Sequence, residues 1–102
     1  MNYYKVEISA ENQYQADTIL NSLLEKKLVT GGQFISMPAR FLWKGKIRNL
    51  DYVTITSFTT AKHKAAIVRD VVKKSAEEVP MVIFLAMDGN KQLLNWIDKT
   101  LT

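Results

Sequence analysis

The sequence of 102 residues predicts an α+β fold in which helices cover one face of a four-stranded antiparallel sheet. Three observations support this fold. A tight turn at Lys44-Gly45 joins two segments of strand composition, a helical pattern precedes the pair, and a second helix and another strand follow it. The order β-α-β-β-α-β is that of a split βαβ domain, and the length fits a single domain spanning residues 1–102.

The first two elements are a strand and a helix. Tyr3 to Ser9 alternates between polar and apolar residues with period 2, which predicts a strand, and Ser9 is a candidate cap for the helix that follows. From Asn12 to Leu28 apolar residues recur at spacings of three and four, which is typical of an amphipathic helix. We expect Gly31-Gly32 to end this helix and begin a turn.

The central hairpin is predicted from two segments rich in strand-forming residues, Gln33 to Trp43 and Ile47 to Phe58. Pro38 interrupts the first of them. Because proline cannot donate a hydrogen bond to a neighbouring strand, we expect either a bulge or an edge position there.

The second half of the chain predicts a helix, a strand and a final helix. Thr59 and Thr60 offer an N-cap for a helix from Ala61 to Ser75, whose expected inward residues are Ala65, Val68, Val71 and Val72. Met81 to Met87 is the fourth strand. Asn90 is a candidate cap for the last helix, whose apolar side is Leu93, Leu94, Trp96, Ile97 and Leu101.

Composition restricts the kind of protein. Lys and Arg number 14 against 10 Asp and Glu, and this net charge of +4 is spread along the chain, which favours a solvated surface over a site for anionic ligands, nucleic acid included. Cysteine is absent, which excludes disulfides, thiolate metal sites and a cysteine nucleophile. No apolar run reaches the ~20 residues of a membrane span, and no signal peptide is visible. We expect a cytoplasmic protein with no membrane partner.

The fourth strand indicates self-association. Met81 to Met87 is apolar on both faces, and the fourth strand of this fold usually lies at an edge of the sheet. A long apolar edge invites pairing with another chain, so we expect an oligomer in which sheets pack against sheets. In the alternative, the C-terminal helix covers this strand and the protein stays monomeric.

Three segments resemble the CutA divalent-cation tolerance family over Tyr4 to Leu101. They are the helix end Leu23 to Leu28, the hairpin Trp43 to Ile47, and a set formed by Thr59-Thr60, Val79-Pro80 and the closing Leu94 to Ile97. The resemblance implies a ferredoxin-like fold, a PII-like homotrimer with grooves between subunits, and a cytoplasmic protein linked to tolerance of copper and other divalent ions.

The sequence differs from that family at positions where members carry residues that can bind a metal ion. Members often have a cysteine where this chain has Gly31. The family's His-Pro-Tyr-Glu-x-Pro-Glu segment corresponds here to Ser75 to Met81, which keeps Glu78 and Pro80 only. We therefore expect weak or absent copper binding.

Two groups of residues are candidate metal ligands, and a divalent cation is the only candidate cofactor. His63 is the single histidine, and copper and zinc favour imidazole, but one histidine per chain needs symmetry to build a site. Glu77 and Glu78, together with Asp88, offer oxygen ligands for magnesium or calcium. The alternatives are a surface histidine and a solvated turn.

The hairpin is the preferred candidate site. With a two-residue loop, Trp43 faces Lys46 and Phe41 faces Arg48, which allows cation–π contacts. These cations and the start of the second helix could bind a small anion in a groove between subunits, with candidate residues Trp43, Lys46, Arg48, Thr60, Lys62, Glu78 and Trp96. In the structural alternative, the aromatic residues pack into a neighbouring subunit.

We interpret the chain as a non-enzymatic, trimeric binding or regulatory protein, because it contains no Ser-His-Asp pattern, P-loop or GxGxxG motif. The main alternative is an RNA-binding module of the same strand order, with Tyr3, Tyr52 and Phe58 as stacking residues on the central strands. An enzyme whose groove forms only in the oligomer is a third option.

Overall fold

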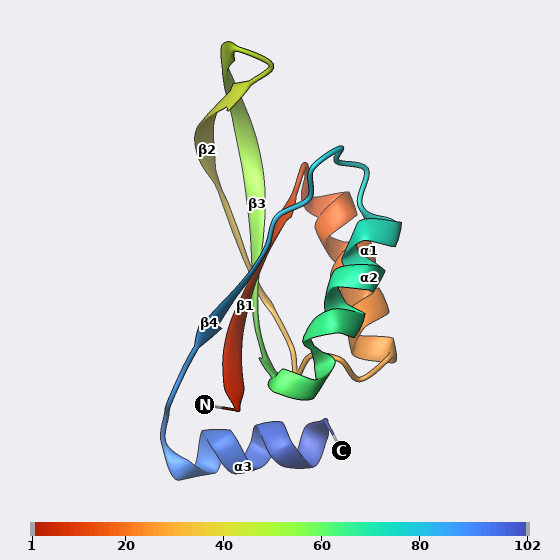
Figure 1. The fold of residues 1–102 in the computed structure, drawn as a ribbon, viewed down its shortest axis with the longest axis vertical. Helices are drawn as coiled ribbons and strands as arrows, with labels where there is room; N and C mark the ends of the chain where they lie inside the picture. The colour runs from red at the N-terminus through yellow and green to blue at the C-terminus, as the bar shows by residue number, and fades with distance from the viewer. Residues whose placement is uncertain (1, 102) are drawn as a thin grey trace.

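The computed structural model describes residues 2–101 as one twisted sheet with two helices against one face and a third helix across one end (Figure 1). The elements in chain order are β1 (Tyr3–Ala10), α1 (Gln13–Glu25), β2 (Gln33–Trp43), β3 (Lys46–Thr60), the 3-10 turn η1 (Ala61–His63), α2 (Lys64–Lys74), β4 (Val82–Ala86) and α3 (Lys91–Thr100). The strands are antiparallel in the order β2-β3-β1-β4. The predicted fold class, element order and edge position of β4 are confirmed.

The core lies between the sheet and helices α1 and α2. Alternation along β1 and β3 turns every second side chain toward the helices, and spacings of three and four on the helices supply the opposing face. The main buried residues are Val6, Ile8, Val53 and Ile55 from the sheet and Ile19, Leu23, Ile67 and Val71 from the helices. Each such side chain contributes about 1.5–3 kcal/mol to folding.

Helix α1 begins later than its predicted cap. β1 continues to Ala10, and the cap is Asn12, whose Oδ1 accepts a hydrogen bond from the Gln15 amide at 2.9 Å. The prediction that Ser9 caps this helix was wrong. Ser9 is buried, and its hydroxyl bonds instead to the segment between α2 and β4, as described below.

Helix α1 also ends earlier than predicted, at Glu25. Lys27 adopts a left-handed conformation with φ 55°. Its amide donates to the Leu24 carbonyl, and the Leu28 amide donates to the Leu23 carbonyl, both at 3.0 Å. This pair of bonds is a Schellman motif, so Lys27 ends the helix and the glycine pair at 31–32 does not.

The β2–β3 hairpin has the predicted turn and cross-strand pairs. Lys44 and Gly45 both have positive φ, 51° and 79°, as a type I′ turn requires. The register is one-to-one from Gln33 opposite Thr56 to Trp43 opposite Lys46. Pro38 is therefore accommodated by the edge position of β2, without a bulge.

Helix α2 is rotated relative to its predicted orientation. Of the four residues expected to face inward, only Val71 is buried, while Ala65, Val68 and Val72 are exposed. The cause is a polar contact between helices: the Asp70 carboxylate accepts hydrogen bonds from Lys26 Nζ and from the Ser22 hydroxyl. Holding Asp70 against α1 turns Ile67 and Val71 into the core.

The residues predicted to cap the later helices occupy N-cap positions, but their side chains do not form capping hydrogen bonds. Thr60 precedes η1 and Asn90 precedes α3, yet neither side chain makes a capping hydrogen bond. Thr59 donates instead to the Leu28 carbonyl at 2.7 Å.

Helix α3 packs across the end of the sheet and leaves the outer face of β4 uncovered (Figure 1). It buries Ile97 and Leu101, and the Tyr3 hydroxyl donates to Asp98 at 2.6 Å. Ile83 and Leu85 on β4 remain 46% and 44% exposed. The alternative in which this helix shields β4 is therefore not the arrangement found. No helix within residues 2–101 is long and apolar enough to cross a membrane.

Replacing Lys27 by glycine should stabilise the protein. Glycine adopts positive φ without the strain of a side chain, and the gain should be about 0.5–1 kcal/mol after the extra entropy of the unfolded chain is deducted. Urea unfolding at fixed chain concentration measures it. Lys27→Ala is the control and should bring no gain. An equal gain in both variants would show that loss of the lysine charge, and not backbone strain, is responsible.

The Asp70 contact should make stability depend on pH. Burial alone would raise the pKa of Asp70, but hydrogen bonds from Lys26 and Ser22 and the charges of Lys26 and Lys74 lower it below the ordinary value of 3.8. Its contribution is therefore present above about pH 4 and is lost as pH falls through the lowered pKa. Asp70→Asn should cost about 1–3 kcal/mol at pH 7 and progressively less below pH 4. A pH-independent difference in urea unfolding would contradict this assignment.

Candidate functional site

The tip of the hairpin and the segment joining α2 to β4 line a cavity of about 580 Å³. The lining combines aromatic rings, carboxylates and aliphatic side chains with a single guanidinium. Its residues are Glu11, Phe41, Leu42, Trp43, Arg48, Leu50, Tyr52, Ala76, Glu77, Glu78, Val79 and Met81.

The hairpin register places the aromatic wall. Phe41 lies directly opposite Arg48, as Trp43 does opposite Lys46, so these side chains share one face of the hairpin. Tyr52 follows on the same face two pleats further along β3. The rings of Phe41 and Tyr52 meet edge-on, with centroids 5.4 Å apart at an interplanar angle of 78°.

The other wall is fixed by hydrogen bonds to β1 and α1. The Ser9 hydroxyl donates to Glu77 Oε2 at 2.8 Å and accepts from the Met81 amide at 2.9 Å, while the Ser9 amide donates to the Met81 carbonyl at 3.0 Å. The Ala76 amide donates to Gln15 Oε1 at 3.1 Å. The segment from residue 75 to 81 is thus held in place although it belongs to no helix or strand.

Charged groups converge at this cavity. Burial raises the pKa of Glu77, the Ser9 hydrogen bond opposes this, and the nearby charge of Glu11 raises the pKa further. At the mouth, Lys44 Nζ lies 3.7 Å from Glu78 Oε2 and 5.5 Å from the centroid of the Trp43 ring. This lysine therefore connects the hairpin tip to the opposite wall.

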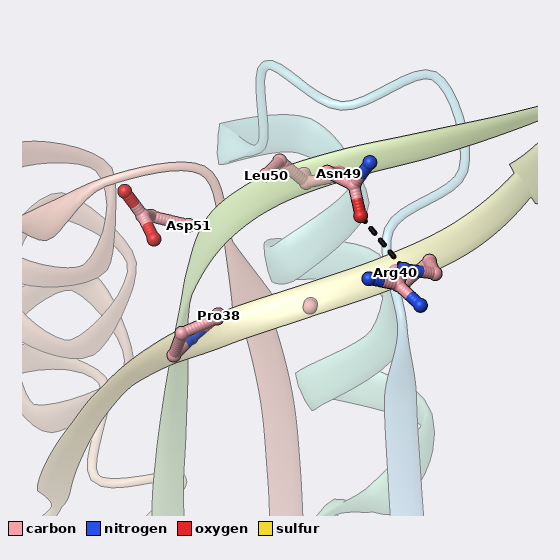
Figure 2. A pocket seen from close by; sticks show the side chains of 6 residues that line it. Pro38, Arg40, Asn49, Leu50 and Asp51 are labelled. Carbon is pink, nitrogen blue, oxygen red and sulfur yellow. Dashed lines mark hydrogen bonds between the residues drawn. The ribbon is translucent and has the colours of Figure 1, made fainter.

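A second, more open cavity of about 500 Å³ lies further down the hairpin, lined by Pro38, Ala39, Arg40, Asn49, Leu50 and Asp51. Figure 2 shows Arg40 and Asn49 pointing toward each other, with Asp51 directed away. Arg40 Nε donates to Asn49 Oδ1 at 2.7 Å. Part of the guanidinium is thus engaged across the strand pair, and fewer polar groups converge here than in the first cavity.

The structure brings together only part of the predicted site. Trp43, Arg48, Glu77 and Glu78 line the 580 Å³ cavity, and Lys46 lies across from Trp43. The other candidate residues lie at the far end of β3 or in later parts of the chain. They are Thr60, Lys62, His63, Asp88 and Trp96. Because β3 is 15 residues long, these two groups cannot meet within one chain.

The candidate residues at the far end of β3 and beyond it make contacts of their own. His63 is half-buried, and its Nε2 lies 3.2 Å from the Leu101 carbonyl oxygen. Since a carbonyl only accepts, Nε2 is the donor in this contact. Lys62 and Trp96 are exposed, whereas Thr60 is buried, with an Oγ1 that has no hydrogen-bond partner among the described residues. Within residues 2–101 no three His, Cys, Asp or Glu side chains are placed to hold a metal ion.

Sequence reasoning missed Ser9 and Glu11 as contributors to the cavity. Ser9 has the parity of the polar side of β1 and yet is buried, which a strand pattern alone does not reveal.

Two of the rings proposed to stack on RNA have partners within the protein: Tyr3 bonds to Asp98, and Tyr52 packs on Phe41. The hydrogen bond to Asp98 raises the pKa of Tyr3.

Comparison with known proteins identifies the family. The model of the CutA1 divalent ion tolerance protein family matches residues 4–100. The divalent-cation tolerance protein CutA of Archaeoglobus fulgidus is 33% identical over 96 residues, which cover 91% of this chain and 92% of that protein.

Solved structures agree in fold. The structure described as the periplasmic divalent cation tolerance protein CutA from Archaeoglobus fulgidus has a TM-score of 0.94 at 26% identity, covering 98% of this chain and 99% of the other. The divalent cation tolerance protein Cut A1 from Thermus thermophilus has a TM-score of 0.92 at 20% identity, with the same coverage of 98% and 99%. The chain therefore belongs to the CutA divalent ion tolerance family and has its ferredoxin-like, PII-like fold.

Proposed function

We propose that this protein is a non-enzymatic binding or regulatory protein that serves tolerance to divalent cations, copper included, and that it acts as a homotrimer in the cytoplasm. The observation that carries the proposal is the family match over residues 4–100. The cavity chemistry supports a binding role, because its lining combines aromatic rings with charged side chains that can hold a ligand.

Self-association is supported by the uncovered parts of the sheet. β2 and β4 are the two edges, and both carry exposed apolar side chains on the face away from the helices, namely Ile35, Met37, Ile83 and Leu85. Leu42 and Ile47, paired across the hairpin tip on its other face, are 76% and 64% exposed. Contact between the β2 edge of one copy and the β4 edge of the next would bury both sets and can close into a ring.

Cation binding would have to use residues from more than one chain, since the described part of a single chain groups no three suitable ligands. His63 supplies an imidazole for copper, and Glu77 and Glu78 supply oxygen for harder cations. The same assembly could bring Lys46 and Arg48 of one copy to Thr60 and Lys62 of another and so complete the anion groove.

The assembly should have a mass of about 35 kDa, three times the 11.7 kDa of one chain, by gel filtration with light scattering. Leu85→Arg places a charge on the uncovered face of β4 and should dissociate the trimer. Tyr14→Arg is the matched control, because Tyr14 is 76% exposed on α1, away from the sheet edges, and this variant should remain trimeric. A wild-type monomer at micromolar concentration would disprove the proposed assembly.

Copper binding should depend on both assembly and His63. Calorimetric titration of Cu²⁺ should show weak binding to the wild type, a loss of about tenfold or more in His63→Ala, and no binding to dissociated Leu85→Arg. Asp17→Asn, an exposed α1 substitution, is the control and should bind as the wild type does. Undiminished binding of one ion per chain in the dissociated variant would exclude a site shared between copies.

A further inference from the structure

We propose that the 580 Å³ cavity between the hairpin and the α2–β4 segment binds a small organic ammonium ion with an apolar body. The site is built within one chain, so the inference depends neither on the trimer nor on binding of a metal ion.

The lining has the two features that recognise such a cation. Phe41, Trp43 and Tyr52 present aromatic rings, and a cation over a ring face is stabilised by about 0.5–2 kcal/mol, most strongly when it is shielded from water. Glu11, Glu77 and Glu78 outnumber the one guanidinium, that of Arg48, so the lining favours a positive charge.

Lys44 shows this recognition chemistry with the protein's own ammonium group. Its Nζ lies over the Trp43 ring at 5.5 Å and beside Glu78 at 3.7 Å. Both side chains of this ion pair are largely exposed, at 70% and 67%, so the contact is weak and can be displaced. We interpret Lys44 as an internal competitor at the mouth of the cavity.

The same arrangement disfavours the other ligand classes. A metal ion needs several converging donors, and the described residues contain no group of three that could hold one. A small anion in this single-chain cavity would meet three carboxylates, whereas the proposed anion groove needs Thr60 and Lys62 of a second copy. The volume lies within the range of small-molecule sites, about 300–1,000 Å³, and Leu50, Val79 and Met81 provide apolar surface for the body of the ligand.

Calorimetry with three matched probes tests the charge preference. Phenethylammonium should bind the wild-type protein saturably at one per chain, whereas neutral 2-phenylethanol and anionic phenylacetate should bind at least tenfold more weakly. Tighter binding of phenylacetate would overturn the proposal, as would complete displacement of phenethylammonium by an equimolar divalent cation.

Variants test the assigned residues. Trp43→Leu and Glu78→Gln should each weaken phenethylammonium binding about tenfold, and Glu78→Gln is an exposed change that should leave folding intact. Lys44→Met should strengthen binding several-fold by removing the competitor, while the matched control Lys46→Met should not. No gain in Lys44→Met together with no loss in Glu78→Gln would refute the site.

The dissociated variant Leu85→Arg distinguishes this inference from the proposed assembly. Equal affinity in Leu85→Arg and in the wild type supports a site within one chain, whatever the oligomeric state. Binding to the dissociated variant alone would show that a neighbouring copy fills the cavity, and the inference would then fail while the assembly stood.

Discussion

The register of the β2–β3 hairpin is the constraint on which the rest of the site depends. The left-handed pair Lys44 and Gly45 sets the loop at two residues and thereby fixes Trp43 opposite Lys46. Since side chains alternate between faces, a slip of one residue would turn the aromatic wall away from the α2–β4 segment. The turn therefore determines both how β2 forms one edge of the sheet and which side chains line the cavity.

The opposite wall has no regular backbone structure of its own, and its position comes from side chains elsewhere. Ser9 holds this segment at two points, Glu77 and Met81, and Gln15 holds it at Ala76. The paired hairpin and the anchored segment together hold the two walls of the cavity in position, and a preformed site lowers the entropy cost of binding a ligand. Positioning by a scaffold is also what lets an irregular segment carry function.

The family relationship explains the fold more fully than the chemistry. A TM-score of 0.92 at 20% identity to the Thermus protein means that the backbone depends on patterning, with few side chains in common. A chain without cysteine and with one histidine can keep this fold while its ligands differ. The helices cover one face of the sheet, and the described residues leave the other face and the two edge strands uncovered.

The sequence alone determined the element order, the bounds of β2, the two-residue turn with its facing pairs, and the edge position of β4. These follow from local rules: period 2 in strands, spacings of three and four in helices, and turn residues that tolerate positive φ. Only the tertiary structure decided that Asp70 rotates α2 and that Ser9 anchors the α2–β4 segment. It also separated His63 and Lys62 from the hairpin cations. Contacts between residues far apart in sequence leave no periodic pattern, so no local rule could have predicted them.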